Sequence, residues 1–145
     1  MPYRFLKDVT ASDVAFEVDA PGVEELFVET GIAVTAVQVE NIQDIRDKIT
    51  RRISLEAENL EELLYKFLDE LIFLKDTDLL LFHDFTRMRI EKGEGGGYTL
   101  TCSGTGEELD LERHHSVVDV KAVTMHQFFV REENGVWRAR VVLDV

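Results

Sequence analysis

Apolar residues recur at helical spacing in two stretches of the chain. The first stretch follows Pro21-Gly22 and predicts a helix with apolar positions that reach as far as Val37. A second helix begins after Asn59, which can cap it, with Glu62 three residues further on as in a capping box. The second helix has one broad apolar face, formed by Leu60, Leu63, Leu64, Phe67, Leu68, Leu71 and Leu74. Such a face is typical of a helix packed on a core rather than of a partner groove.

The remaining apolar positions follow the pattern of β-strands. Six segments are candidate strands: 14–18, 53–57, 79–91, 98–103, 117–130 and 137–143. The inward parity of the third segment switches near Phe85, which predicts a bulge or bend. The fifth segment is apolar at both parities, which predicts a central strand covered on both faces. Gly93 to Gly97 lies between two strands and has no following helix, so we interpret it as a hairpin turn and not as a phosphate loop.

The predicted order of elements is β-α-β-α-β-β-β-β. It corresponds to an α+β fold with two helices packed on a mostly antiparallel or mixed β-sheet. The length of 145 residues predicts a single domain over residues 1–145.

The end of the chain carries the strongest hairpin signal, Asn134-Gly135. If this dipeptide forms a two-residue turn and the register continues, Met125 faces Asp144 and Thr124 faces Val145. The last two residues are then held in the sheet. The Asp144 side chain and the terminal carboxylate of Val145 lie close together, and like charges held together favour a counter-cation. Their oxygens suit hard cations, although the spacing alone favours a solvated strand end.

Lys121 has the same parity as Met125 and therefore lies on the face predicted for Asp144. Lys121 lies four positions before Met125 in the strand, which corresponds to about 13 Å at ~3.3 Å per residue. This distance is too long for a direct ion pair but short enough for Lys121 and Asp144 to line one patch.

The composition is strongly acidic, with 29 acidic and 16 basic residues and a net charge of −13. Such a surface repels phosphate backbones, so direct nucleic-acid binding is not expected. A basic protein patch or a cation is a better partner than a nucleic acid, although the charge taken alone favours a role in solubility only. The single cysteine, Cys102, permits no internal disulfide. The start of the chain has no apolar signal region and no segment could span a membrane, so we expect a cytoplasmic protein.

Several motifs together resemble the archease family over nearly the whole chain. They are Leu63–Leu71, Gly106–Asp110, Arg113-His114, Val120–His126, Trp137 and Leu143-Asp144-Val145. The V-K-A-V-T-M-H run and the terminal D-V are specific in combination. The family's T-A-D element corresponds here to Ala11-Ser12-Asp13, in which only the acid is retained.

The resemblance implies an accessory protein rather than an enzyme. Archeases assist the RtcB-type RNA-splicing ligase, which joins tRNA halves with GTP and a divalent metal, by promoting the ligase–guanylate intermediate and repeated turnover. By resemblance, Asp13, Asp144 and Val145 bind a divalent metal. Calcium is the first expectation for this metal, with magnesium or manganese as alternatives.

Three further residues are candidate contacts with the ligase: Lys121, Glu107 and Glu108. Lys121 could equally be an edge residue whose amine reaches water, and the two glutamates could pair locally. His126 is interpreted as a sheet histidine rather than a ligand. Two other function classes stay open, a chaperone-like binding module with an exposed apolar patch and a stand-alone metal-dependent enzyme. The enzyme is disfavoured because no nucleophile–base pair or dense ligand cluster is present.

Overall fold

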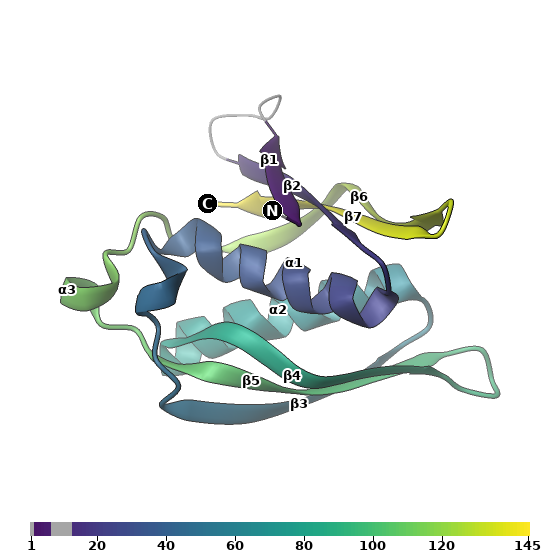
Figure 1. Cartoon of the computed structure of the whole chain (residues 1–145), viewed down its shortest axis with the longest axis horizontal. Coiled ribbons are helices and arrows are strands. Elements are labelled where there is room, and N and C mark those ends of the chain that lie inside the picture. The colour runs from purple at the N-terminus through teal and green to yellow at the C-terminus, as the bar shows by residue number, and fades with distance from the viewer. Residues whose placement is uncertain (1, 7–12) are drawn as a thin grey trace.

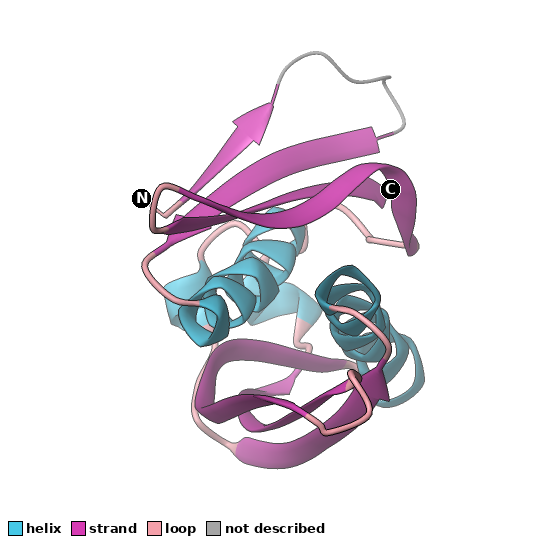
Figure 2. Cartoon of the chain, turned by 90° about the vertical axis from the view of Figure 1, so that its right-hand side faces the viewer, coloured by secondary structure: helices cyan, strands magenta, loops and turns pink. Residues whose placement is uncertain are grey.

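Two antiparallel sheets enclose a layer of two helices in the computed structural model (Figures 1 and 2), which describes residues 2–6 and 13–145. The predicted α+β class is confirmed, and the paired strands within each sheet are antiparallel. The strands do not form one sheet, however, but divide into two. The two helices make this arrangement possible because each is wedged between the sheets and buries residues on a wide part of its circumference.

The first sheet contains both ends of the described chain. Its strands, in spatial order, are β1 (Tyr3–Leu6), β2 (Asp13–Ala20), β7 (Val136–Asp144) and β6 (Ala122–Glu133). Strand β1 was not predicted, because four residues give too short a pattern to recognise. The prediction of a central strand over residues 117–130 is wrong. Strand β6 lies at the edge of the sheet, and Met125 is 56% exposed.

The second sheet consists of β3 (Ile49–Ala57), β5 (Tyr98–Glu108) and β4 (Leu80–Lys92), in that spatial order. The predicted hairpin at 93–97 is confirmed, and Gly93 N donates to Gly97 O at 2.7 Å. The predicted irregularity near Phe85 is also confirmed, because the β4–β5 register shifts on both sides of it.

The helical layer consists of α1 (Val23–Gln38) and α2 (Leu60–Asp78). Asn59 caps α2 as predicted, with its side-chain oxygen accepting from Glu62 N at 2.8 Å. Two short helices, η1 (Ile42–Asp44) and α3 (Leu111–His114), were not predicted. Among the described residues, no helix is long and apolar enough to cross a membrane.

Helix α1 packs closely on α2 and β4 at Gly31. A Cβ atom at this position would lie 2.7 Å from the ring of Phe85 and 3.1 Å from the ring of Phe67. The absence of a side chain at Gly31 therefore lets these rings pack face to edge, with centroids 5.2 Å apart.

Candidate metal site at the end of the first sheet

Asp13 and Asp144 are directly opposite each other in the ladder between β2 and β7. Directly opposed residues of an antiparallel pair have Cα atoms about 4.5–5.5 Å apart and project their side chains to the same face. The pairing is rigidly supported, because the ladder continues without interruption to Ala20 and Trp137. The sheet therefore brings together two of the three predicted metal ligands.

Both carboxylates lie on the outer face of the first sheet. On β7, Val141 and Leu143 are fully buried in the core cluster next to the helices, so the alternating residue Asp144 points away from the helices. Asp144 is half-buried, and the side chain of Val145 packs against the core cluster. This packing holds Val145, the third predicted ligand, beside the aspartate pair.

The predicted pairing of β6 with β7 is correct only near the turn. Glu133 faces Val136 as predicted, and the register continues to the pair of Phe129 and Arg140. The register then shifts by three residues, so that Ala122 faces Asp144. The predicted partners of Asp144 and Val145, namely Met125 and Thr124, are therefore wrong.

The cause of the shift is a bulge over residues 125–128 of β6. Gln127 adopts a positive φ of 56° there, and its side-chain oxygen accepts from Arg140 Nη2 at 2.7 Å. Four residues of β6 are thereby accommodated opposite Val141 alone. His126 belongs to this bulge, so it lies in the sheet as predicted, but its side chain is exposed and not part of the core.

The bulge brings Lys121 to the metal corner, by which we mean Asp13, Asp144 and Val145. Lys121 N donates to Asp144 O at 2.8 Å. The predicted separation of about 13 Å between Lys121 and the strand position that faces Asp144 is therefore wrong. Lys121 is exposed, as the edge interpretation expected.

A buried lysine on α2 holds the segment that leads to Lys121. Lys75 is only 6% exposed, and its Nζ donates to Asp119 Oδ1 at 2.5 Å and to Val120 O at 2.6 Å. Sequence reasoning missed this residue, although a signal was present. Lys75 follows Leu71 by four residues and Leu68 by seven, so it lies on the apolar face of the helix.

The donor atoms of the metal corner are all oxygens, which fits a hard cation such as Ca²⁺ or Mg²⁺. Over residues 2–6 and 13–145, no group of three or more His, Cys, Asp or Glu side chains could hold a metal. A metal at this corner therefore requires the carboxylate of Val145, main-chain oxygens or water in addition to the aspartates. Ala11 and Ser12, the neighbours of Asp13 in its motif, lie outside the described residues.

Glu107 is turned inward and is fully engaged within the chain. Its carboxylate accepts from Arg46 N at 2.6 Å and from His114 Nε2 at 2.9 Å, and it also pairs with Arg113. Burial acts to raise the pKa of Glu107, but the hydrogen bonds from Arg113, His114 and Arg46 outweigh it and bring the pKa to about 2. Of the two glutamates considered for partner contact, only Glu108 is exposed.

The Gly106–Asp110 and Arg113-His114 motifs together form one structural unit. Asp110 caps α3 through hydrogen bonds from Glu112 N and Arg113 N. His114 is fully buried, and its Nδ1 accepts from Asp110 N at 2.8 Å. The ring proton therefore lies on Nε2, which donates to Glu107. These residues stabilise the fold around α3 rather than chelate a metal.

Known proteins similar to this chain share one family. The model of the Archease protein family (MTH1598/TM1083) matches residues 3–145. The protein archease of Pyrococcus abyssi is 37% identical over 135 residues, which cover 92% of this chain and 93% of the relative. The protein archease of Methanopyrus kandleri is 34% identical over 145 residues and the full length of both chains.

Solved structures show the same fold. The solution structure of protein 1598 from Methanobacterium thermoautotrophicum matches with a TM-score of 0.85 and 34% identity, over 99% of each chain. A crystal structure of an archease from Thermotoga maritima, described as a possible chaperone, matches with a TM-score of 0.57 and 19% identity over 98% of each chain, which shows the fold alone. From the match over residues 3–145 and the full-length relatives, this chain belongs to the archease family.

Proposed function

We propose that this chain is a metal-binding activator of the GTP-dependent RtcB-type RNA-splicing ligase and is not itself an enzyme. It promotes guanylylation of the ligase and multiple turnover in tRNA splicing and RNA repair. Membership of the archease family supports an accessory role. The observation that carries the proposed site is the direct opposition of Asp13 and Asp144 beside Val145.

The charge of the protein supports docking of the metal corner in a ligase active site. A cleft that binds GTP and RNA ends must favour anions, and the chain has a net charge of −13. Complementary charge speeds such encounters and orients the partners. The exposed Lys121 next to Asp144 and the exposed Glu108 are proposed contacts with the ligase. Calcium is the proposed metal, with magnesium or manganese as alternatives.

The test is multiple-turnover RNA ligation by the ligase with and without this protein. Wild type is compared with Asp144→Ala and with the matched control Glu132→Ala, which removes an exposed acid from β6. We expect stimulation by wild type and by the control but not by Asp144→Ala. Equal stimulation by Asp144→Ala would refute the proposed site, and no stimulation by wild type would refute the function. A short Gly-Ser extension after Val145 tests the contribution of its carboxylate.

A general chaperone-like function is the second candidate, and exposed apolar side chains favour it. Phe73 is 57% exposed, Leu111 is 70% exposed and Val117 is 62% exposed. Phe73 lies on α2, Leu111 on α3 and Val117 in the loop between α3 and β6, and singly exposed apolar residues are normal on a protein surface. Suppression of the aggregation of unrelated proteins, unchanged by Asp144→Ala, would favour this function over ligase activation.

A further inference from the structure

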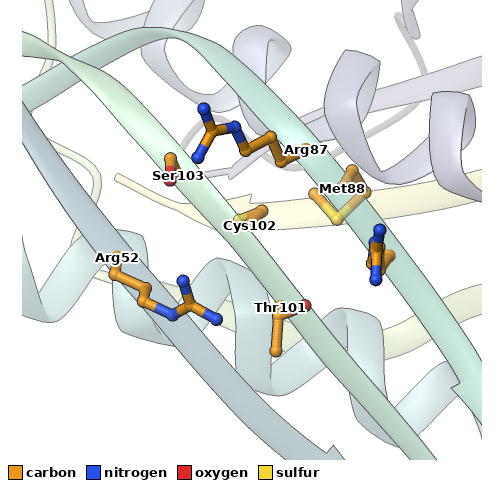
Figure 3. Close-up of a pocket in the computed structure, with 7 residues that line it drawn as sticks. Arg52, Arg87, Met88, Thr101, Cys102 and Ser103 are labelled. Atoms are coloured by element: carbon orange, nitrogen blue, oxygen red, sulfur yellow. The ribbon is translucent and has the colours of Figure 1, made fainter.

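Three arginines converge on the outer face of the second sheet, whereas the metal corner belongs to the first sheet. Arg52 of β3 and Arg87 and Arg89 of β4 line a concavity of about 440 Å³, together with Thr101 and Ser103 of β5. Figure 3 shows Arg52 and Arg87 reaching from the two flanking strands toward the central strand. We call this concavity the arginine pocket.

The arginines of this pocket form no ion pair with any of residues 2–6 and 13–145. Within these ranges, six other arginines form ion pairs to carboxylates: Arg4, Arg51, Arg113, Arg131, Arg138 and Arg140. In the part of the chain that the structure describes, the guanidinium groups of Arg52, Arg87 and Arg89 have neither an ion pair nor a hydrogen bond. Like charges held together favour an external counter-ion, and none of the acidic side chains that the structure describes supplies one.

A bulge in β4 produces the convergence. Thr86 pairs with Ser103 and Arg89 pairs with Thr101, so Arg87 and Met88 together oppose Cys102 alone. Met88 packs against the core, whereas Arg87, with a φ of 55°, is exposed. The extra residue thus places two arginines of one strand on the solvent side, as bulges commonly re-aim side chains.

The thiol of Cys102 does not neutralise this positive charge. Burial raises the pKa of Cys102 to about 12, so the thiol stays protonated at neutral pH. The polar groups that face an incoming ligand are therefore three guanidinium groups and two hydroxyls, all of which can donate hydrogen bonds.

Acidic residues limit the positive zone at both ends. The register places Glu56 and Glu91 on either side of Thr99, two residues from Thr101. At the other end Asp84 pairs with Thr105. Since residues two apart on a strand are separated by about 7 Å, the positive zone is only two rows of side chains long. A compact anion fits this zone, whereas a polyanion that extended beyond it would meet carboxylates.

We propose that the arginine pocket binds the phosphate group of a small molecule. Guanidinium groups present parallel N–H donors that match phosphate oxygens, and Thr101 and Ser103 add hydroxyl donors. The proposal is independent of ligase activation, because the pocket lies on the second sheet and the metal corner on the first.

The test is a titration of the whole protein followed by backbone amide NMR and by calorimetry. The probes are inorganic phosphate, ATP, a short oligouridylate RNA, and acetate at matched ionic strength. Arg52→Gln and Arg87→Gln are compared with Arg46→Gln, an exposed arginine outside the pocket. We expect phosphate and ATP to shift the amides of Thr101 and Ser103, and each pocket variant to weaken binding about tenfold. Arg46→Gln and Asp144→Ala are expected to bind as wild type.

Three results would overturn the proposal. The first is a shift of the same amides by acetate that equals the shift by phosphate. The second is phosphate binding at wild-type affinity by Arg52→Gln and Arg87→Gln, whose amide spectra report whether they are folded. The third is RNA binding tighter than ATP binding and lost in both variants, which would assign the arginines to a nucleic-acid surface.

Discussion

Asp13 and Asp144 are directly opposite each other in the ladder between β2 and β7, so two carboxylates share one face at the end of the sheet. Like charges directly opposite each other destabilise a sheet. A bound cation would turn this repulsion into attraction, because both carboxylates would then serve as ligands.

Replacing Asp144 with Asn separates the repulsion from the proposed metal binding. Without calcium we expect Asp144→Asn to unfold at the same temperature as wild type or a higher one, because one of two opposed charges is removed. With calcium, wild type should gain stability through ligand linkage and the variant should not. Thermal unfolding with and without calcium measures both effects, and Glu132→Gln serves as the control. Equal stabilisation of wild type and Asp144→Asn by calcium would contradict the proposed metal site.

Replacing Lys75 with Met should loosen the metal corner from inside the protein. The variant keeps the apolar stem but loses the hydrogen bonds to Asp119 and Val120. We expect faster hydrogen exchange at the amide of Lys121, which donates to Asp144 O, and a stability loss of about 1 kcal/mol. Hydrogen-exchange mass spectrometry measures the first effect. Lys66→Met, an exposed lysine of the same helix, should leave exchange at Lys121 unchanged.

Glu107 should make the protein sensitive to acid. Its pKa falls from 4.5 to about 2 on folding, so the ionised group stabilises the fold above about pH 4.5. This contribution is lost as the pH falls from about 4.5 toward about 2. We expect Glu107→Gln to be less stable than wild type by about 2 kcal/mol near neutral pH.

The difference between wild type and Glu107→Gln should shrink as the pH falls through the same window. Urea unfolding of both proteins at neutral and at acidic pH provides the measurement. A difference that stays constant with pH would show that the ionised carboxylate is not what stabilises this region.

Gly31→Ala should destabilise the protein although alanine favours helices. The helical preference of Ala over Gly amounts to about 1 kcal/mol. The added Cβ would lie 2.7 Å from the Phe85 ring, and overpacking of this kind costs about 1–3 kcal/mol. The melting temperature should fall, whereas Gly95→Ala, which meets no atom within 4 Å, should not lower it. A rise in Gly31→Ala would show that the Phe85 ring can move aside.

The sequence alone could not decide the role of the Gly106–Asp110 motif. The sequence allowed Glu107 either to pair locally or to contact a partner. The structure shows local pairing, because α3 brings Arg113 and His114 back onto the carboxylate. A four-residue helix has too short a pattern to be predicted, so this return of the chain could not be foreseen.

The local signals in the sequence determined the α+β class, the start of α2 at its Asn59 cap and both hairpin turns. These features depend on residues a few positions apart, so a linear pattern contains them. The parity switch in the sequence also indicated the irregularity of β4 near Phe85, whereas the tertiary structure alone decided the division into two sheets and the register shift within β6. Residues 117–130 are apolar at both parities, so their pattern does not show where this bulge lies, and only packing against the neighbouring strand selects the register. For this reason the sequence placed Lys121 too far from Asp144, and the fold brings them together.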